Sequence, residues 1–193
     1  MNTTTIAVDL AKHVFEVAVT NAAGGTPVRH RFTRAQFERF IRSHAPAHVV
    51  MEACGTSHYW GRTAQAVGHR VTLLPAQYVR PFVRRQKTDR TDTAGLLDAV
   101  RSEGLKPVAV KTVVQQELLA LHRIRNQWMA TRTARINALR GFLREYGILV
   151  PSGARRGIAA VGWILEDAEA PVPGRLRRAL ASRLLGPGSR GAY

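Results

Sequence analysis

The fold is decided by the stretch Thr5-Ile-Ala-Val-Asp-Leu-Ala-Lys-His-Val-Phe-Glu-Val-Ala-Val-Thr20. Its first five residues are apolar and β-branched up to Asp9, which is typical of a short buried strand. Residues 13–20 alternate between apolar and polar side chains, so they predict a second strand beside the first. An acidic residue that ends an apolar strand is unusual, and Asp9 is therefore the first candidate functional residue.

The rest of the first 108 residues continues this pattern. Strands are expected at 5–9, 13–20, 27–33, 48–51 and 71–74, and helices at 34–44, 57–67 and 89–103. Ser57 and Thr88 are the expected helix caps, and Gly68 and Gly104 the expected helix ends. Three consecutive strands followed by alternating helices and strands predict an α/β fold with a mixed sheet flanked by helices. This is the element order of the ribonuclease H-like fold.

Residues 113–146 predict one very long helix, because they contain no proline and a single glycine, Gly141. An apolar stripe follows helical spacing and consists of Val114, Leu118, Leu121, Ile124, Trp128, Ile136, Leu139, Leu143 and Tyr146. Arginines interrupt a strict heptad, so the segment is interpreted as a helical arm or imperfect coiled coil. Such a helix is expected to pack on a second chain or on a missing domain.

The charge of the chain indicates a polyanionic partner. The 193 residues carry 29 Lys+Arg against 13 Asp+Glu, a formal net charge of +16, which points to nucleic acid. Cys54 is the single cysteine, so an intrachain disulfide and a cysteine zinc cluster are excluded. Without a signal peptide or an apolar run of ~20 residues, the protein is expected to be cytoplasmic, with no membrane partner.

Four acidic residues stand out by their positions. Asp9 and Glu52 each end an apolar strand, and Asp89 and Asp92 lie three apart at a helix start. Singly, each has a structural explanation: a strand-end acid can face solvent, and an acid in a first helical turn satisfies the helix dipole. Together they predict a site for Mg²⁺ or Mn²⁺, since clustered carboxylates need a hard cation between them. Two such ions about 3.5–4 Å apart support phosphodiester chemistry.

Three motifs resemble one protein family. They are Asp9-Leu-Ala-Lys12, Met51-Glu-Ala-Cys-Gly-Thr-Ser-His-Tyr-Trp60 and Lys87-Thr-Asp-Arg-Thr-Asp-Thr-Ala94. The chain resembles the DEDD transposases of insertion-sequence family one hundred and ten, also called bridge-RNA-guided recombinases. The similarity runs through Gln116-Glu-Leu-Leu-Ala-Leu and Ile136-Asn-Ala-Leu-Arg to near Pro151.

The resemblance implies a RuvC-like catalytic domain in a bacterial, nucleoid-associated protein that acts on DNA. Asp9, Glu52, Asp89 and Asp92 would be its catalytic metal ligands, and DNA cleavage and strand transfer its chemistry. The long helix would form a coiled coil that supports a homo-oligomer and holds a structured guide RNA and DNA. The nucleophilic serine of the family's second domain is carried over to no residue of this chain.

Basic and aromatic residues supply further candidates. Nucleic-acid contacts are predicted at Lys12, Arg84, Arg85, Lys87, Arg125, Arg132, Arg135 and Arg140; the alternative is a solvated basic face. Tyr59 and Trp60 have two interpretations, stacking on a base or packing against the sheet.

The expected organisation has three parts. Residues 1–108 form the metal-binding domain, 109–150 the helical arm, and 151–193 a Gly/Pro/Arg-rich tail with a short helix at Arg175–Leu185. The tail is interpreted as a truncated or frameshifted start of the second transposase domain. Two alternatives stay open: a RuvC-like junction nuclease that acts alone, and a nucleic-acid-binding remnant whose metal site is idle.

Overall fold

The computed structural model describes residues 3–21, 25–82, 89–102 and 104–185, with the backbone alone at 89–91 and 183–185. The chain divides into two compact units, Met1–Gln116 and Glu117–Tyr193.

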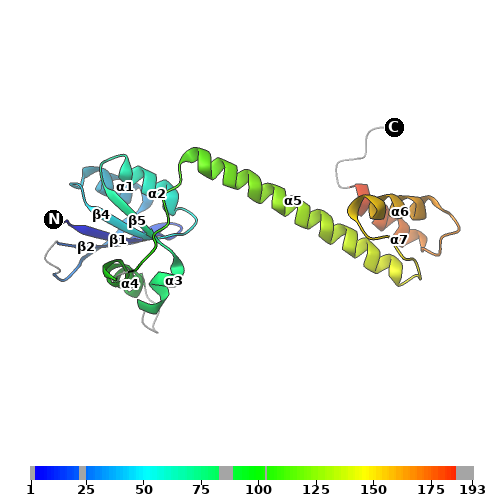
Figure 1. Ribbon diagram of the computed structural model, residues 1–193, viewed down its shortest axis with the longest axis horizontal. Coiled ribbons are helices and arrows are strands. Elements are labelled where there is room, and N and C mark those ends of the chain that lie inside the picture. Colours follow the sequence, from blue (N-terminus) through cyan, green and yellow to red (C-terminus); the bar gives the residue numbers. More distant parts are fainter. Residues whose placement is uncertain (1–2, 22–24, 83–88, 103, 186–193) are drawn as a thin grey trace. The chain divides into compact units, whose positions relative to one another are not determined.

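The first unit is a five-stranded mixed sheet with helices on both faces (Figure 1). Its elements are β1 (Thr5–Asp9), β2 (Val14–Thr20), β3 (Val28–Thr33), α1 (Arg34–Ser43), β4 (His48–Glu52), α2 (Ser57–Gln65), β5 (Arg70–Leu74), α3 (Ala76–Val79), the 3-10 helix η1 (Arg80–Phe82) and α4 (Asp89–Arg101). The strand order is β3-β2-β1-β4-β5, with β1 antiparallel to β2 and parallel to β4. The ribonuclease H-like arrangement predicted from the sequence is confirmed; α3 and η1 were not predicted.

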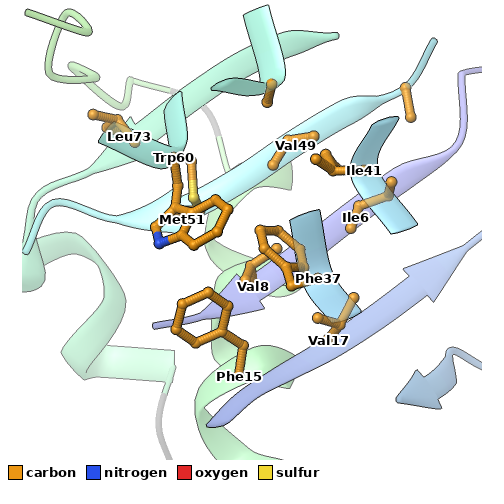
Figure 2. Close-up of a cluster of buried hydrophobic side chains, with 12 residues drawn as sticks. Ile6, Val8, Phe15, Val17, Phe37, Ile41, Val49, Met51, Trp60 and Leu73 are labelled. Atoms are coloured by element: carbon orange, nitrogen blue, oxygen red, sulfur yellow. The ribbon is translucent and has the colours of Figure 1, made fainter. Parts of the chain in front are cut away.

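Helices α1 and α2 cover one face of the sheet over an aromatic core (Figure 2). The rings of Phe15, Phe37 and Trp60 meet edge to face, with centroids 5.1–5.3 Å apart. All three side chains are at most 2% exposed. Edge-to-face rings add to the stabilisation from area burial, so this cluster fixes α1 and α2 on the sheet.

The N-termini of α1 and α2 are capped differently. Thr33 and Gln36 form a reciprocal capping box at the start of α1, at 3.3 and 2.8 Å. At α2 the predicted cap was wrong: the N-cap is Thr56, which makes no side-chain cap bond. The Ser57 hydroxyl instead donates to the Cys54 carbonyl at 2.9 Å and accepts from the Cys54 amide at 3.1 Å, closing the turn between β4 and α2. The predicted cap Thr88 lies outside the described residues.

Helix α4 covers the opposite face of the sheet (Figure 1). Leu96, Leu97 and Ala99 of α4 are buried against Ala7 of β1 and Val50 of β4. Beyond the helix Gly104 has φ +77°, a conformation that costs glycine little and explains why the helix ends there. The two faces are therefore covered by different parts of the chain, α1 and α2 on one and α4 on the other.

The second unit consists of most of α5 (Val113–Arg144), with α6 (Ala154–Glu166) and α7 (Gly174–Leu185). The predicted long helix is present, and Gly147, with φ +75°, follows it. Leu139 and Leu143 of α5 pack with Val161 of α6 and Leu180 of α7. The C-terminal part of the apolar stripe is thus covered within the chain, whereas a second chain or a missing domain was expected. Helix α6 was not predicted, and α7 matches the expected short helix.

Two partly buried arginines link segments of the second unit. Arg140 donates to the carbonyls of Pro151 at 2.6 Å and Gly153 at 3.0 Å, just before α6. Arg177 donates to the carbonyls of Ile164, Leu165 and Ala170 at 2.9–3.2 Å. Both arginines therefore satisfy carbonyl groups at helix ends and loops that would otherwise lack donors.

The N-terminal part of α5 leaves its apolar residues exposed. Val114, Leu118, Leu121 and Trp128 are 57–73% exposed. Thr112 and Gln115 form a second capping box at the start of this helix. Across the described segments, the helices are too short or too polar to cross a membrane.

We expect Phe37→Ala to destabilise the first unit by about 3–5 kcal/mol, because it removes the ring that contacts both Phe15 and Trp60. Chemical denaturation followed by tryptophan fluorescence measures this loss. Val28→Ala, at a site 60% exposed in β3, is the control and should change stability by at most about 0.5 kcal/mol. Equal losses in the two variants would contradict the assignment of the aromatic cluster as the core.

His48 makes the stability of the first unit pH-dependent. Its Nδ1 accepts from Arg70 at 2.8 Å and its Nε2 donates to Thr72 at 2.8 Å. Burial, and then the charge of Arg70, lower the His48 pKa from 6.5 to about 4. Between these two values the unfolded chain binds a proton that the folded chain does not, so stability is full above pH 6.5 and falls towards pH 4.

In thermal denaturation at a series of pH values, the Tm of His48→Asn should fall less steeply between pH 6.5 and 4 than that of the wild type. Asparagine keeps an acceptor near the place of Nδ1 and cannot take up a proton. His13→Asn, at an exposed histidine between β1 and β2, should keep the wild-type slope. Parallel curves for the wild type and His48→Asn would show that His48 is not the titrating group.

Candidate metal and nucleic-acid site

The sheet register brings two of the predicted acidic residues to neighbouring strand ends. In the parallel pair β1–β4, Val8 lies opposite Met51. Asp9 and Glu52 are the next residues on each strand, and both strands end there. Carboxyl ends of adjacent parallel strands meet at one edge of a sheet, which is where α/β folds assemble their sites.

Both side chains belong to the face that α4 covers. Side chains alternate along a strand, so Asp9 shares a face with Ala7, and Glu52 shares one with Val50. Ala7 and Val50 pack in the core beneath α4. The aromatic core lies on the other face, with Val8 and Met51. The two strand-end acids thus point to the side of the sheet that carries α4.

Helix α4 adds a third acid to this face. Asp92 lies one turn before Leu96, which is buried against the sheet. Thr93, 1% exposed, accepts a hydrogen bond from Arg29 of β3 at 2.8 Å, which ties the start of α4 to the sheet. Asp92 Oδ1 is buried and has no hydrogen-bond partner among the described residues. A buried carboxylate oxygen without a partner is costly and points to a missing ligand.

Glu16 is an acidic residue of this face that the sequence reasoning missed. It lies directly opposite Asp9 in the antiparallel pair β1–β2. Like charges opposite each other destabilise a sheet. Arg31 on β3 offsets this repulsion with an ion pair to Glu16 at 3.3 Å. The alternation of residues 13–20 was the signal, because it places Glu16 on the face away from Phe15 and Val17.

The remaining predicted residues near these acids are only partly described. Arg84, Arg85 and Lys87 lie outside the described residues, and Asp89 is described by its backbone alone, as the first residue of α4. Among the side chains that the structure describes, no three His, Cys, Asp or Glu groups come together closely enough to hold a metal ion. Asp9, Glu52 and Asp92 share a face without forming a closed set of ligands.

The basic residues predicted to contact nucleic acid divide into two groups. Lys12 is exposed in the turn after β1, and Arg125, Arg132 and Arg135 are exposed on α5. Arg140 differs, because its guanidinium group is occupied by backbone carbonyls and by Asn137 at 3.2 Å. These contacts give Arg140 a structural role and leave the exposed residues as the better candidates.

A further basic cluster stands where α5 begins. Arg62 of α2 donates to the Lys111 carbonyl at 2.7 Å and to Gln116 at 2.6 Å. The backbone amide of Lys111 donates to His58 at 3.2 Å. Burial, then the charges of Lys111 and Arg62, lower the His58 pKa. The cluster anchors the start of α5 on α2 and adds positive charge there.

The two aromatic residues after Glu52 have different surroundings. Trp60 is 2% exposed in the aromatic core, as the packing interpretation expected. Tyr59 is 48% exposed beside it, with the ring centroids 5.1 Å apart. Of the pair, Tyr59 is the residue whose ring is accessible to a partner.

The comparisons with known proteins identify the family of the chain. The family model of DEDD transposases of the IS110 type, described as "Transposase", matches residues 6–148. A probable family 20 transposase of Pseudomonas aeruginosa is 38% identical over 176 residues, which cover 91% of this chain and 51% of that protein. The transposase for insertion sequence element IS1111A of Coxiella burnetii is 35% identical over 91% of this chain and 48% of its own length.

A third relative, the transposase for insertion sequence element IS1328 of Yersinia enterocolitica, is 36% identical over 83% of this chain and 47% of its own length. The chain therefore spans about half the length of the curated relatives it matches. The matched range runs from the second residue of β1 through α4 and all of α5, and so includes the acidic face as well as the long helix. On this evidence, the chain belongs to the IS110 family of DEDD transposases.

Proposed function

We propose that this chain is the metal-binding catalytic part of a DNA transposase that cleaves and transfers DNA strands with Mg²⁺ or Mn²⁺. The metal ligands are Asp9, Glu52, Asp89 and Asp92. The observation that carries the proposal is the gathering of acids on the sheet face under α4, where the buried Asp92 Oδ1 has no hydrogen-bond partner among the described residues. Family membership supports the same assignment.

The residues present fit a divalent metal. Their donor atoms are carboxylate oxygens, the hard ligands that Mg²⁺ and Mn²⁺ prefer. Without a cation, carboxylates repel each other because they carry the same charge. This repulsion explains why the three acids share a face but do not come together around one point. An ion there would give the buried oxygen of Asp92 a partner. When bound, the metal would activate the attacking oxygen and stabilise the leaving oxygen of a phosphodiester.

Other residues of the chain would position the acids and bind the DNA. Thr93 and Arg29 fix the first turn of α4 over the sheet, which positions Asp92 relative to Asp9. Lys12, exposed three residues after Asp9, is placed to bind a DNA phosphate beside the acids. Arg31 holds Glu16 in an ion pair, which reduces the negative charge next to Asp9.

The guide RNA and the homo-oligomer are further parts of this proposal. The N-terminal part of α5 exposes an apolar stripe that includes Val114, Leu118 and Leu121, and such a face fits a second copy of the helix. Arginines lie along the same helix and can contact RNA or DNA phosphates. Nucleoid association follows if DNA is the partner.

A second candidate function is nucleic-acid binding without cleavage. It is favoured by the lack of a closed set of three metal-binding side chains among the described residues. Only the catalytic candidate requires divalent-metal binding at the acidic face, so an absence of metal binding would exclude it, whereas a remnant with an idle site could bind the ion without cleaving DNA.

Isothermal titration calorimetry with Mg²⁺ and Mn²⁺ tests the proposal. Asp9→Asn and Asp92→Asn should each weaken metal binding by at least about tenfold, since even outer-shell changes cost roughly that much. Metal should raise the Tm of the wild type and have little effect on the Tm of either variant. Asp98→Asn is the matched control, at an exposed residue of the same helix, and should bind metal like the wild type.

No metal binding by the wild type, even with DNA present, would refute the catalytic proposal and leave the second candidate. An equal loss in Asp98→Asn would show that the metal binds by general charge, away from Asp9 and Asp92.

A further inference from the structure

A pocket of about 390 Å³ lies in the second unit, where α6 packs against α5. Trp128, Arg132 and Arg135 line it from α5, and Ile158 lines it from α6. The three α5 residues are spaced by four and three positions, so they lie on one side of the helix. Neither the acidic face nor the sheet takes part in this pocket.

The interior of the pocket is apolar, and part of its lining belongs to the hydrophobic core of the second unit. Ile136 and Leu139 at the floor are 4% and 2% exposed. Leu139 is anchored in the cluster that joins α5, α6 and α7. Trp128 and Ile158 are 73% and 38% exposed, so they offer an aromatic and an aliphatic surface to solvent. A flat apolar group can enter with little rearrangement of the protein.

The rim of the pocket is positive. Arg132 and Arg135 make no hydrogen bond or ion pair to another residue that the structure describes, in contrast to Arg140 and Arg177. Residues 117–193 contain 13 arginines and five acidic residues, and none of the five lines the pocket. Thr131 adds a hydroxyl group beside the arginines. The rim therefore suits phosphate groups next to the apolar interior.

We propose that this pocket binds an unpaired base of single-stranded nucleic acid, stacked on Trp128, with its flanking phosphates on Arg132 and Arg135. A flat ring attached to an anionic backbone matches an indole face beside two guanidinium groups. A paired base is stacked inside its duplex and presents no free face, so a duplex would meet the arginines alone. An acidic peptide would also meet the arginines but would leave the apolar interior unfilled.

This inference rests on the proposed function, in which nucleic acid is the partner. It adds that one unpaired base of that nucleic acid is bound in this pocket. It rests on that partner and not on the metal site, since every lining residue belongs to α5 or α6. Loss of metal binding and loss of base binding can therefore be observed separately.

The test is fluorescence anisotropy with the full chain and labelled single strands of oligothymidine and oligouridine. Trp128→Ala should weaken binding of a single strand by about five- to one-hundredfold, the range for loss of one base–aromatic stack. Trp128→Phe should recover part of the affinity. Trp163→Ala is the matched control, at a tryptophan of α6 that is 78% exposed and outside the pocket, and should bind like the wild type.

Further measurements separate a base pocket from general charge and identify the source of the base. A strand with abasic sites and a duplex should both be nearly insensitive to Trp128→Ala. Arg132→Gln should weaken the binding of intact strands, abasic strands and duplex alike, and should do so more than Arg125→Gln. A preference for oligothymidine or for oligouridine identifies DNA or RNA as the source of the base, and either result supports the pocket.

The proposal is overturned if the wild type binds no single strand, or if Trp128→Ala and Trp163→Ala lose affinity equally. It is also overturned if abasic and intact strands respond alike to Trp128→Ala, or if an acidic peptide binds more tightly than either single strand. Circular dichroism checks that the exposed substitutions leave the helices intact.

Discussion

The parallel pairing of β1 with β4 is the constraint on which the site depends. It aligns two strands that both end in an acid, and because side chains alternate, it fixes both acids on one face of the sheet. A shift of one residue in either strand would move its acid into the aromatic core. The apolar residues before Asp9 and Glu52 prevent that shift, since Ile6, Val8, Val49 and Met51 must stay buried under α1 and α2.

The two faces of the sheet consequently have different roles. The face under α1 and α2 is apolar and aromatic, and its burial provides stability. The face under α4 buries Ala7, Ala18, Val50 and Leu74, and it carries acids at the strand ends. Gathering acids costs stability, and Asp92 adds to this cost, because its buried Oδ1 has no hydrogen-bond partner in the part of the chain that the structure describes. The aromatic core offsets this cost, and a cation on the acidic face would remove much of it.

Most of the first unit could be predicted from the sequence, because strand alternation and turn residues are local signals. Thr33-x-x-Gln36 and Thr112-x-x-Gln115 are capping boxes that the sequence reasoning did not use, although the spacing is visible. Ser57 was predicted as a cap because of its residue type, but its hydroxyl is engaged by Cys54. Helix α6 was not predicted because it lies in a segment rich in glycine, proline and arginine, although Ile158, Val161 and Leu165 follow helical spacing.

Other features could not be predicted, because they depend on contacts between distant segments. Nothing in the sequence near Arg140 indicates that its guanidinium group is occupied by the carbonyls of Pro151 and Gly153. The pocket beside Trp128 exists only because α6 folds against α5. The acids could be predicted as candidates from the sequence. That they share one face of the sheet became clear only from the strand register, and that Asp92 is buried only from the packing of α4.

We propose that Asp9, Glu52, Asp89 and Asp92 bind one divalent-metal centre under α4. Anomalous diffraction from crystals grown with Mn²⁺ tests it most directly, because the metal is located without reference to activity. We expect anomalous density in contact with carboxylate oxygens of Asp9 and Asp92, and none there in crystals of Asp92→Asn. Density confined to other surface acids, or the same density in the variant, would contradict the account.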